Sequence, residues 1–291
     1  MLRDTKANKI FLIILISFIA ILFSMDFVWQ KRGKENRSEQ SFSFAASDSL
    51  TITTVSSDIV LAVDPKAREG LVSIGENDKK NLKAVKSGKE LSIVVSPLSR
   101  GFLNFFNSQA TPLIVTLPQA QIDRLEIKTT SGDILFMQDF EGRDIHINSI
   151  NGDVDMLNLT SSENLHIKTI SGDISGYSAK SDGKLTFAST SGDFEVGTLE
   201  GKTLSLHTTS GDIEGLVHIL PQGSLEGSTT SGELELDLSK TEDLDIHATK
   251  VSGSILFNNQ RQGGSPALAS TGNKRTVVKL GTVSGDLDIR F

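Results

Sequence analysis

The sequence of 291 residues contains no cysteine, one tryptophan and one tyrosine. Without cysteine the chain has no disulfide framework, thiolate metal site, iron–sulfur cluster, cysteine nucleophile or lipid-modified amino-terminal cysteine. The scarcity of Trp and Tyr argues against a glycan cleft lined by aromatic rings. The formal net charge is −7 and no basic stripe runs along the chain, so the sequence predicts no nucleic-acid partner.

One long apolar run stands near the amino terminus. Residues 10–25 carry no charge, and the run resumes after Asp26 to give about 20 residues, enough for a helix to cross a bilayer. We therefore predict a cytoplasmic tail at 1–9, a transmembrane signal-anchor at 10–29 and a polar linker at 30–47. The short tail and the large polar body place the body outside the cell membrane. A cleaved signal peptide is the alternative, although no small-x-small site follows the run.

The rest of the chain is dominated by an internal repeat. The tripeptide Ser-Gly-Asp, or a close variant, recurs with its glycines 19 to 21 residues apart, except for a last step of 32. A period this regular indicates stacked structural units. The glycines of the repeat are Gly132, Gly152, Gly172, Gly192, Gly211, Gly232, Gly253 and Gly285.

Each repeat unit alternates apolar and polar residues. In the unit of Gly172, apolar Leu165 and Ile167 precede the glycine, and Ile174 begins a second apolar alternation after it. This period of two is that of a strand with one buried face. Most glycines have a Ser or Thr three residues earlier. This side chain is expected inside the corner, where its hydroxyl forms hydrogen bonds with polar groups of the bent backbone. The glycine itself is expected to supply a backbone angle that other residues resist.

Two architectures fit this pattern. The first is an all-β, repetitive β-solenoid (β-helix-like) of ~20-residue rungs, preceded by one transmembrane helix. The second is an antiparallel meander in which every Ser-Gly is a hairpin turn. We favour the solenoid, because a stack must keep its residues in phase whereas a meander need not. Residues 121–291 form the repeat solenoid in this interpretation, and residues 48–120 are the amino-terminal part of the same β domain.

The repeat also resembles a known family. Leu117-Pro118, followed by Leu125-x-Ile127-x-Thr129-x-Ser131-Gly132-Asp133-Ile134 and further copies of that unit, resembles the bacterial β-strand-repeat "putative adhesin" family of unknown function. The resemblance covers roughly residues 50–291. A membrane anchor ahead of such a domain is similar to the layout of LiaG-type proteins, which are encoded with cell-envelope stress systems of Firmicutes. The resemblance carries over no catalytic residue.

The repeat turns are the first candidate site. Their carboxylates would stack at ~4.8 Å between rungs, and each neighbouring pair would repel by about 1 kcal/mol in water. Asp after Ser-Gly is an ordinary turn residue, so we predict a structural role. Calcium between rungs is the alternative, and otherwise no cofactor and no metal are predicted. The turn residues are Gly132, Asp133, Gly152, Asp153, Gly172, Asp173, Gly192, Asp193, Gly211 and Asp212.

Two further features stand outside the turns. An aromatic segment holds Phe102, Leu103, Phe105 and Phe106 and is expected either to plug the open end of the stack or to contact a membrane or apolar ligand. His146 and His166 occupy the same outward position in adjacent units, as does His247 further on. A metal site formed by a pair of these surface histidines would lack a third ligand.

The end of the chain is a third candidate feature. It stops inside its last strand at Phe291, so that this carboxy-terminal edge is expected to pair with another copy unless Asp286, Asp288 and Arg290 protect it. Residues 258–274 before that strand read as a flexible excursion.

No catalytic grouping stands apart from the repeat. The sequence therefore predicts a non-enzymatic, membrane-anchored extracytoplasmic module. It would interact at the surface in an adhesin-like manner with a cell-wall polymer or an envelope protein. By analogy with the LiaG-type layout, it would act in the envelope-stress response. The alternatives are a scaffold that assembles through the solenoid edges and a glycan-active β-helix enzyme.

Overall fold

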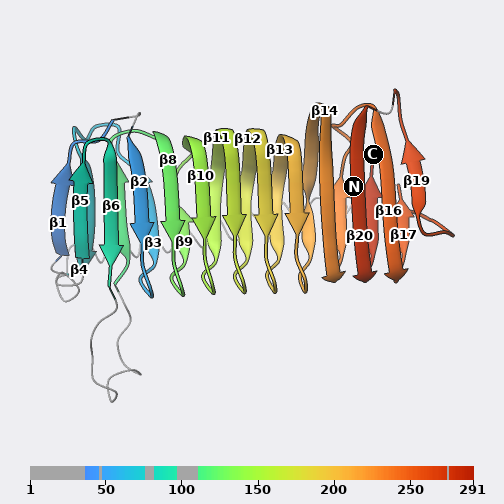
Figure 1. Ribbon diagram of the computed structural model, residues 1–291, viewed down its shortest axis with the longest axis horizontal. Coiled ribbons are helices and arrows are strands. Elements are labelled where there is room, and N and C mark those ends of the chain that lie inside the picture. Colours follow the sequence, from blue (N-terminus) through green and yellow to red (C-terminus); the bar gives the residue numbers. More distant parts are fainter. Residues whose placement is uncertain (1–36, 46–47, 76–81, 97–110, 274) are drawn as a thin grey trace, which may run out of the picture.

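The computed structural model describes residues 37–45, 48–75, 82–96, 111–273 and 275–291. These residues form one 21-stranded sheet that winds into a rod, with consecutive rungs side by side along its length (Figure 1). The predicted all-β repeat is therefore confirmed. The predicted anchor at 10–29 lies outside the described residues, and the part of the chain that is described contains no helix capable of spanning a bilayer.

The rod has two faces. Strands of the first face, in spatial order, are β5 (Leu82–Ser87), β6 (Glu90–Val95), β2 (Ser49–Thr53), β8 (Gln121–Lys128), β10 (Phe140–Asn148), the second halves of β11 (Val154–Lys168), β12 (Ile174–Ala188), β13 (Phe194–His207) and β14 (Ile213–Ser231), then β20 (Thr276–Ser284), β16 (Leu244–Ser252) and β19 (Ala267–Ser270).

The second face contains the first halves of the same long strands. Its order is β1 (Arg37–Phe42), β4 (Gly70–Gly75), β7 (Leu113–Leu117), β3 (Ile59–Val63), β9 (Ile134–Phe136), the first halves of β11 to β14, then β15 (Leu234–Asp237), β21 (Leu287–Arg290), β17 (Ile255–Phe257) and β18 (Gln260–Arg261).

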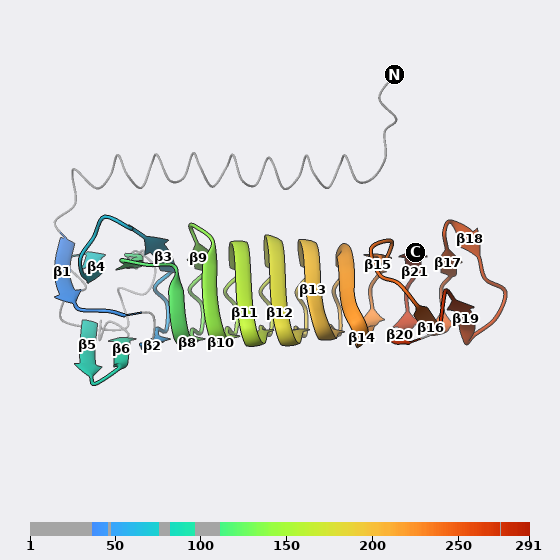
Figure 2. The same ribbon diagram turned by 90° about the horizontal axis from the view of Figure 1, so that it is seen from above.

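A rung is one first-face strand, the corner that follows it and one second-face strand. Neighbouring central rungs pair in parallel and in register, so that Val154 lies opposite Ile174 and Leu165 opposite Leu185. Parallel pairing confirms the solenoid, and the antiparallel meander is wrong. The strand after one corner continues through a bend into the strand before the next corner, as Figure 2 shows from above.

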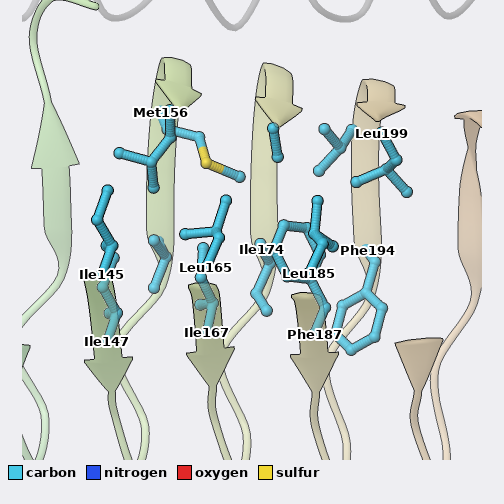
Figure 3. Packing of buried hydrophobic residues seen from close by; sticks show 14 of the residues in the cluster. Ile145, Ile147, Met156, Leu165, Ile167, Ile174, Leu185, Phe187, Phe194 and Leu199 are labelled. Carbon is cyan, nitrogen blue, oxygen red and sulfur yellow. The ribbon is translucent and has the colours of Figure 1, made fainter. Parts of the chain in front are cut away.

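The core lies between the two faces. Every second side chain points inward, as with buried Leu165, Ile167 and Ile174 on β11 and β12. The same inward positions repeat on neighbouring rungs and form continuous apolar columns (Figure 3). Burial of each Leu or Ile side chain contributes roughly 1.5–3 kcal/mol, and these columns set the register because a slip by one residue would expose all of them.

Hydroxyl side chains fill the inside of the corners, as predicted. Thr169 is buried and donates its hydroxyl to the Gly172 carbonyl at 2.6 Å, while the Gly152 N–H donates to Ser149 Oγ at 2.8 Å. These bonds satisfy backbone groups that turn away from the strand ladders, which a corner would otherwise leave unpaired inside the protein.

At both ends the order of rungs differs from the order of the chain. The rung β2–β3 lies between β6–β7 and β8–β9. At the other end the rung β20–β21 lies between β14–β15 and β16–β17, and Figure 1 shows β20 between β14 and β16.

This order corrects the expectation that the chain ends on an exposed edge. Leu287 on β21 lies opposite Leu234 on one side and Ile255 on the other, so the last strand is an inner strand. Within the described residues the outermost strands are β1 and β5 at one end and β18 and β19 at the other. The segment 258–274, expected to be a flexible excursion, contains β18 and β19.

Candidate functional site

The Ser-Gly-Asp corners line one long edge of the rod, and glycine is needed there for close stacking. A Cβ atom on Gly172 would lie 2.1 Å from the Gly152 carbonyl oxygen of the preceding rung, and one on Gly192 would lie 2.0 Å from that of Gly172. Of the eight corner glycines, only Gly253 has a positive φ, at 102°. The expectation that every corner glycine supplies a special backbone angle is therefore wrong, because contact between rungs excludes the side chain.

The corner aspartates form a ladder of hydrogen bonds. Each carboxylate accepts the backbone N–H of the corresponding residue on the next rung, as Asp153 Oδ1 does from Asp173 at 2.9 Å. The same bond joins Asp58 to Asp133, Asp133 to Asp153, Asp173 to Asp193, Asp193 to Asp212, Asp212 to Glu233 and Asp286 to Ser254. The ladder thus includes Asp58 on β2–β3, which lacks the tripeptide Ser-Gly-Asp.

These bonds give the corner carboxylates a structural task. A carboxylate that accepts a backbone N–H satisfies a donor that the strand ladders leave over at the corner. Apart from half-buried Asp193, the ladder aspartates are exposed, so the ladder also presents a row of negative charge along one edge. In the part of the chain that is described, no three acidic or histidine side chains are grouped so that they could hold a metal ion.

A second acidic column runs beside the first, on the outer surface of the second face. Its members come two residues after the corner acid of their rung: Asp155, Glu195, Glu214, Glu235 and Asp288. Ser175 replaces the acid in one rung and donates a hydrogen bond to Asp155 at 2.5 Å. This column was not among the predicted sites, although its constant offset from the corner acid is visible in the sequence.

Burial and neighbouring charges raise the pKa of two side chains in the second column. Burial, together with the charges of Asp153, Asp133 and Asp173, raises the pKa of Asp155, and the bond from Ser175 partly offsets this rise. Burial and the charges of nearby corner aspartates likewise raise the pKa of Glu195. Further along the column, Arg290 pairs with Glu235 at 2.5 Å. The two columns therefore form a negatively charged band, whose inner column contains half-buried Asp155, Glu214, Glu235 and Asp288 and exposed Glu195.

The two histidines predicted as a pair lie next to each other. The ring centroids of His146 and His166 lie 5.7 Å apart on the outer surface of the first face. His146 Nε2 lies 3.0 Å from Asp144 Oδ1, and burial together with the His146 charge lowers the pKa of His166. His247 does not join them, since it lies on β16 near the far end and 3.5 Å from Asp245.

The aromatic candidates Phe102, Leu103, Phe105 and Phe106 lie outside the described residues, in the connection between β6 and β7. In the described part, Phe44 packs against the core at the same end of the rod. The Lys86 ammonium lies 5.3 Å from the centre of the Phe44 ring and forms an ion pair with Asp48. Phe44 and Lys86 thus cover apolar surface at this end of the stack.

Comparison with solved structures shows the same fold in other bacterial proteins. A "putative adhesin" from Bacteroides fragilis NCTC 9343 is 13% identical, with a TM-score of 0.55, and the match covers 88% of this chain and 97% of that one. A "putative lipid binding protein" from Parabacteroides distasonis ATCC 8503 is 19% identical, with a TM-score of 0.50, and the match covers 87% and 97% of the two chains.

Comparison with curated proteins finds no match to this chain. The family model described as Toastrack DUF4097 matches residues 47–290, which is nearly the whole stack of rungs. The chain belongs to the Toastrack DUF4097 family.

Proposed function

We propose that this protein is a non-enzymatic interaction module, held at the outer side of the cell membrane by a single span at 10–29. The β domain would present its surface to a cell-wall polymer or an envelope protein in an adhesin-like manner. The apolar run and the polar linker at 30–47 support the anchoring. The adhesin-like layout and the LiaG-type arrangement suggest a role in the response to envelope stress.

The observation that carries this proposal is the regularity of the surface. Along the corner edge the same chemical group recurs on successive rungs, from Asp133 through Asp212, with the inner acidic column beside it. A repeated row of groups can contact an extended partner at many equivalent points, and several weak contacts then add up to stable attachment. This arrangement suits a polymer or an extended protein better than a small molecule.

Co-sedimentation tests this function. A fragment that begins at Arg37 keeps β1, which pairs with β4, and lacks the predicted anchor. It would be pelleted with isolated cell-wall polymer and, separately, with liposomes, each with and without calcium. The liposomes are included because one structural neighbour is named a lipid-binding protein. Saturable pelleting with wall polymer is the expected result.

Variants locate the contact. Asp173→Asn with Asp193→Asn removes two corner charges and keeps the oxygen that accepts the backbone N–H. His146→Gln with His166→Gln is the matched change on the first face. A loss of pelleting in the corner variant alone would assign binding to the acidic band. Pelleting with liposomes only would direct attention to Phe102, Phe105 and Phe106, and no pelleting in any condition would refute direct binding to the envelope.

A further inference from the structure

The rung β20–β21, called here the terminal rung, occupies a slot between two rungs that precede it in the chain. The Leu234 N–H donates to the Asp286 carbonyl at 3.0 Å, and the Leu287 N–H donates to the Ser254 carbonyl at 2.9 Å. The terminal rung is thus bonded to β14–β15 on one side and to β16–β17 on the other, and its insertion separates two rungs that follow each other in sequence.

Side-chain volume explains this order. On the inner column of the first face, Leu206 is followed in space by Gly227, then by Leu280, then by Ala248. A Cβ on Gly227 would lie 2.8 Å from Leu280 Cδ2, so the leucine side chain fills the space that this glycine leaves. In the order of the chain, Gly227 would face Ala248 and a void would remain. Insertion of Leu280 between two small residues closes that void.

The polar groups of the terminal rung are less well satisfied. Among the described residues, four buried side-chain polar atoms have no hydrogen-bond partner, and three of them belong to this rung: Thr282 Oγ1, Asp288 Oδ1 and Arg290 Nε. The corresponding hydroxyl of Thr169 in a central rung is bonded to a carbonyl and to Ser189. The terminal rung therefore has three unsatisfied buried polar atoms, although Arg290 pairs with Glu235 and Asp286 accepts hydrogen bonds from Ser254.

We propose that the terminal rung is an exchangeable element and that its slot accepts the terminal rung of a second copy of this chain. Every contact that holds the rung is made equally well by the rung of another copy, which makes strand exchange a low-cost route to a dimer. The connection that would have to open joins β19 to β20, and opening it breaks the hydrogen bonds of Thr271 to Leu244 and of Asn273 to Asp243. The partner is recognised by Leu280 entering the space between Gly227 and Ala248.

Single thiols introduced into the full chain test this proposal, since the chain has no cysteine of its own. Ser231 and Ser284 are exposed neighbours across the slot. Full chains carrying only Ser231→Cys or only Ser284→Cys are mixed, incubated at several concentrations and treated with a short bis-maleimide. Exchange predicts a linked heterodimer whose yield rises with incubation time and concentration.

Two controls make the result decisive. Ser191→Cys places an equally exposed thiol at the corner of a central rung, so its linkage to Ser284→Cys measures random encounter. A single chain with both Ser231→Cys and Ser284→Cys must link within itself, which reports that the variants fold with the rung in its slot.

Exchange predicts several-fold more heterodimer from the Ser231→Cys mixture than from the Ser191→Cys mixture, and a faster rise when Leu280→Ala is added. Equal yields from the two mixtures, together with linkage inside the double variant, would overturn the proposal. Failure of the double variant to link would overturn it too, because the rung would then not occupy the slot.

Discussion

The central rungs and the two ends of the rod follow different rules. From β10 to β14 each rung stacks on the one before it in the chain, with partners 18 to 21 residues apart. At the ends the chain turns back, so that β2–β3 and β20–β21 each lie one rung inside the outermost rung. A repeated sequence therefore specifies the register between rungs, while the neighbour of a given rung depends on the shape of its side chains.

The ends also change the direction of pairing. The outermost strands β1, β5, β18 and β19 pair antiparallel with their neighbours, whereas the central strands are parallel. These end strands are six residues long or shorter, and β5 carries Lys83 and Lys86. Short and charged edge strands discourage further addition of strands. The last strand, β21, thereby lies inside the stack, and the exposed edges are short antiparallel strands.

Substitution of a corner glycine in the centre should have the largest effect. Gly172→Ala places a Cβ 2.1 Å from a backbone oxygen, and both neighbouring rungs are fixed by their own ladders. The rungs would have to separate, so we expect a loss of more than about 4 kcal/mol in the free energy of unfolding. Denaturant unfolding followed by circular dichroism measures it.

Gly263→Ala is the matched control for this prediction. A Cβ there has no atom within 4 Å, and the residue is not among those with positive φ. We expect its free energy of unfolding to stay within about 0.5 kcal/mol of the parent. Tolerance of alanine at Gly172 would mean that the rungs are not stacked as closely as described.

The order of rungs at the carboxy-terminal end depends on Leu280. Leu280→Ala leaves a void between Gly227 and Ala248 and should cost about 3 kcal/mol. Combining it with Ala248→Leu exchanges the two volumes and would now favour direct stacking of β16 on β14. We expect this double variant to recover much of the lost stability and to weaken the linkage between thiols at positions 231 and 284. Unchanged linkage would show that volume does not decide the order.

Loss of a corner hydroxyl should destabilise the protein more in a central rung than in the terminal rung. Thr169→Val removes a bonded hydroxyl and leaves the Gly172 carbonyl without this partner, at a cost of about 1–3 kcal/mol. Thr282→Val removes a hydroxyl that has no partner, so stability should change by less than about 0.5 kcal/mol or should increase. Thermal unfolding of both variants provides the comparison. Equal losses would contradict the difference drawn between the two rungs.

Much of the central region could be predicted from the sequence because its signals are local. The alternation around Leu165 and Ile167 and the hydroxyl before most glycines identify strands, core and corner without knowledge of distant contacts. The order of the end rungs could not be predicted in this way. Gly227 and Ala248 are visible in the sequence as small residues at an inner position, but their consequence depends on Leu280, which follows Ala248 after three further strands.

The reason why glycine occupies the corners could not be inferred from the sequence either. A repeated Ser-Gly suits a turn with positive φ equally well, and only the spacing between rungs shows that the carbonyl of the preceding rung occupies the place of a side chain. Residues 53–59 resemble a degenerate unit of the repeat, but Asp58 was not among the predicted turn residues, since its rung has Ser57 where the others have glycine.

The smallest predicted effect concerns the inner acidic column. The raised pKa of Asp155 means that its charged form is less stable in the folded protein than in the unfolded chain. Asp155→Asn removes this charge and keeps an oxygen that can accept the bond from Ser175. At pH 7, where Asp155 is ionised, we expect the variant to be more stable than the parent by up to about 1 kcal/mol.

The stability gain expected for Asp155→Asn depends on pH. As the pH falls through the raised pKa of folded Asp155, the parent takes up a proton, and below the pKa of the unfolded chain both proteins are neutral at this position. The advantage of Asp155→Asn should therefore shrink on acidification and vanish. Asp182→Asn, which removes an exposed carboxylate at the opposite corner, is the control for the loss of one negative charge. Unfolding curves for the three proteins between neutral and acidic pH would show whether the corner edge bears excess negative charge.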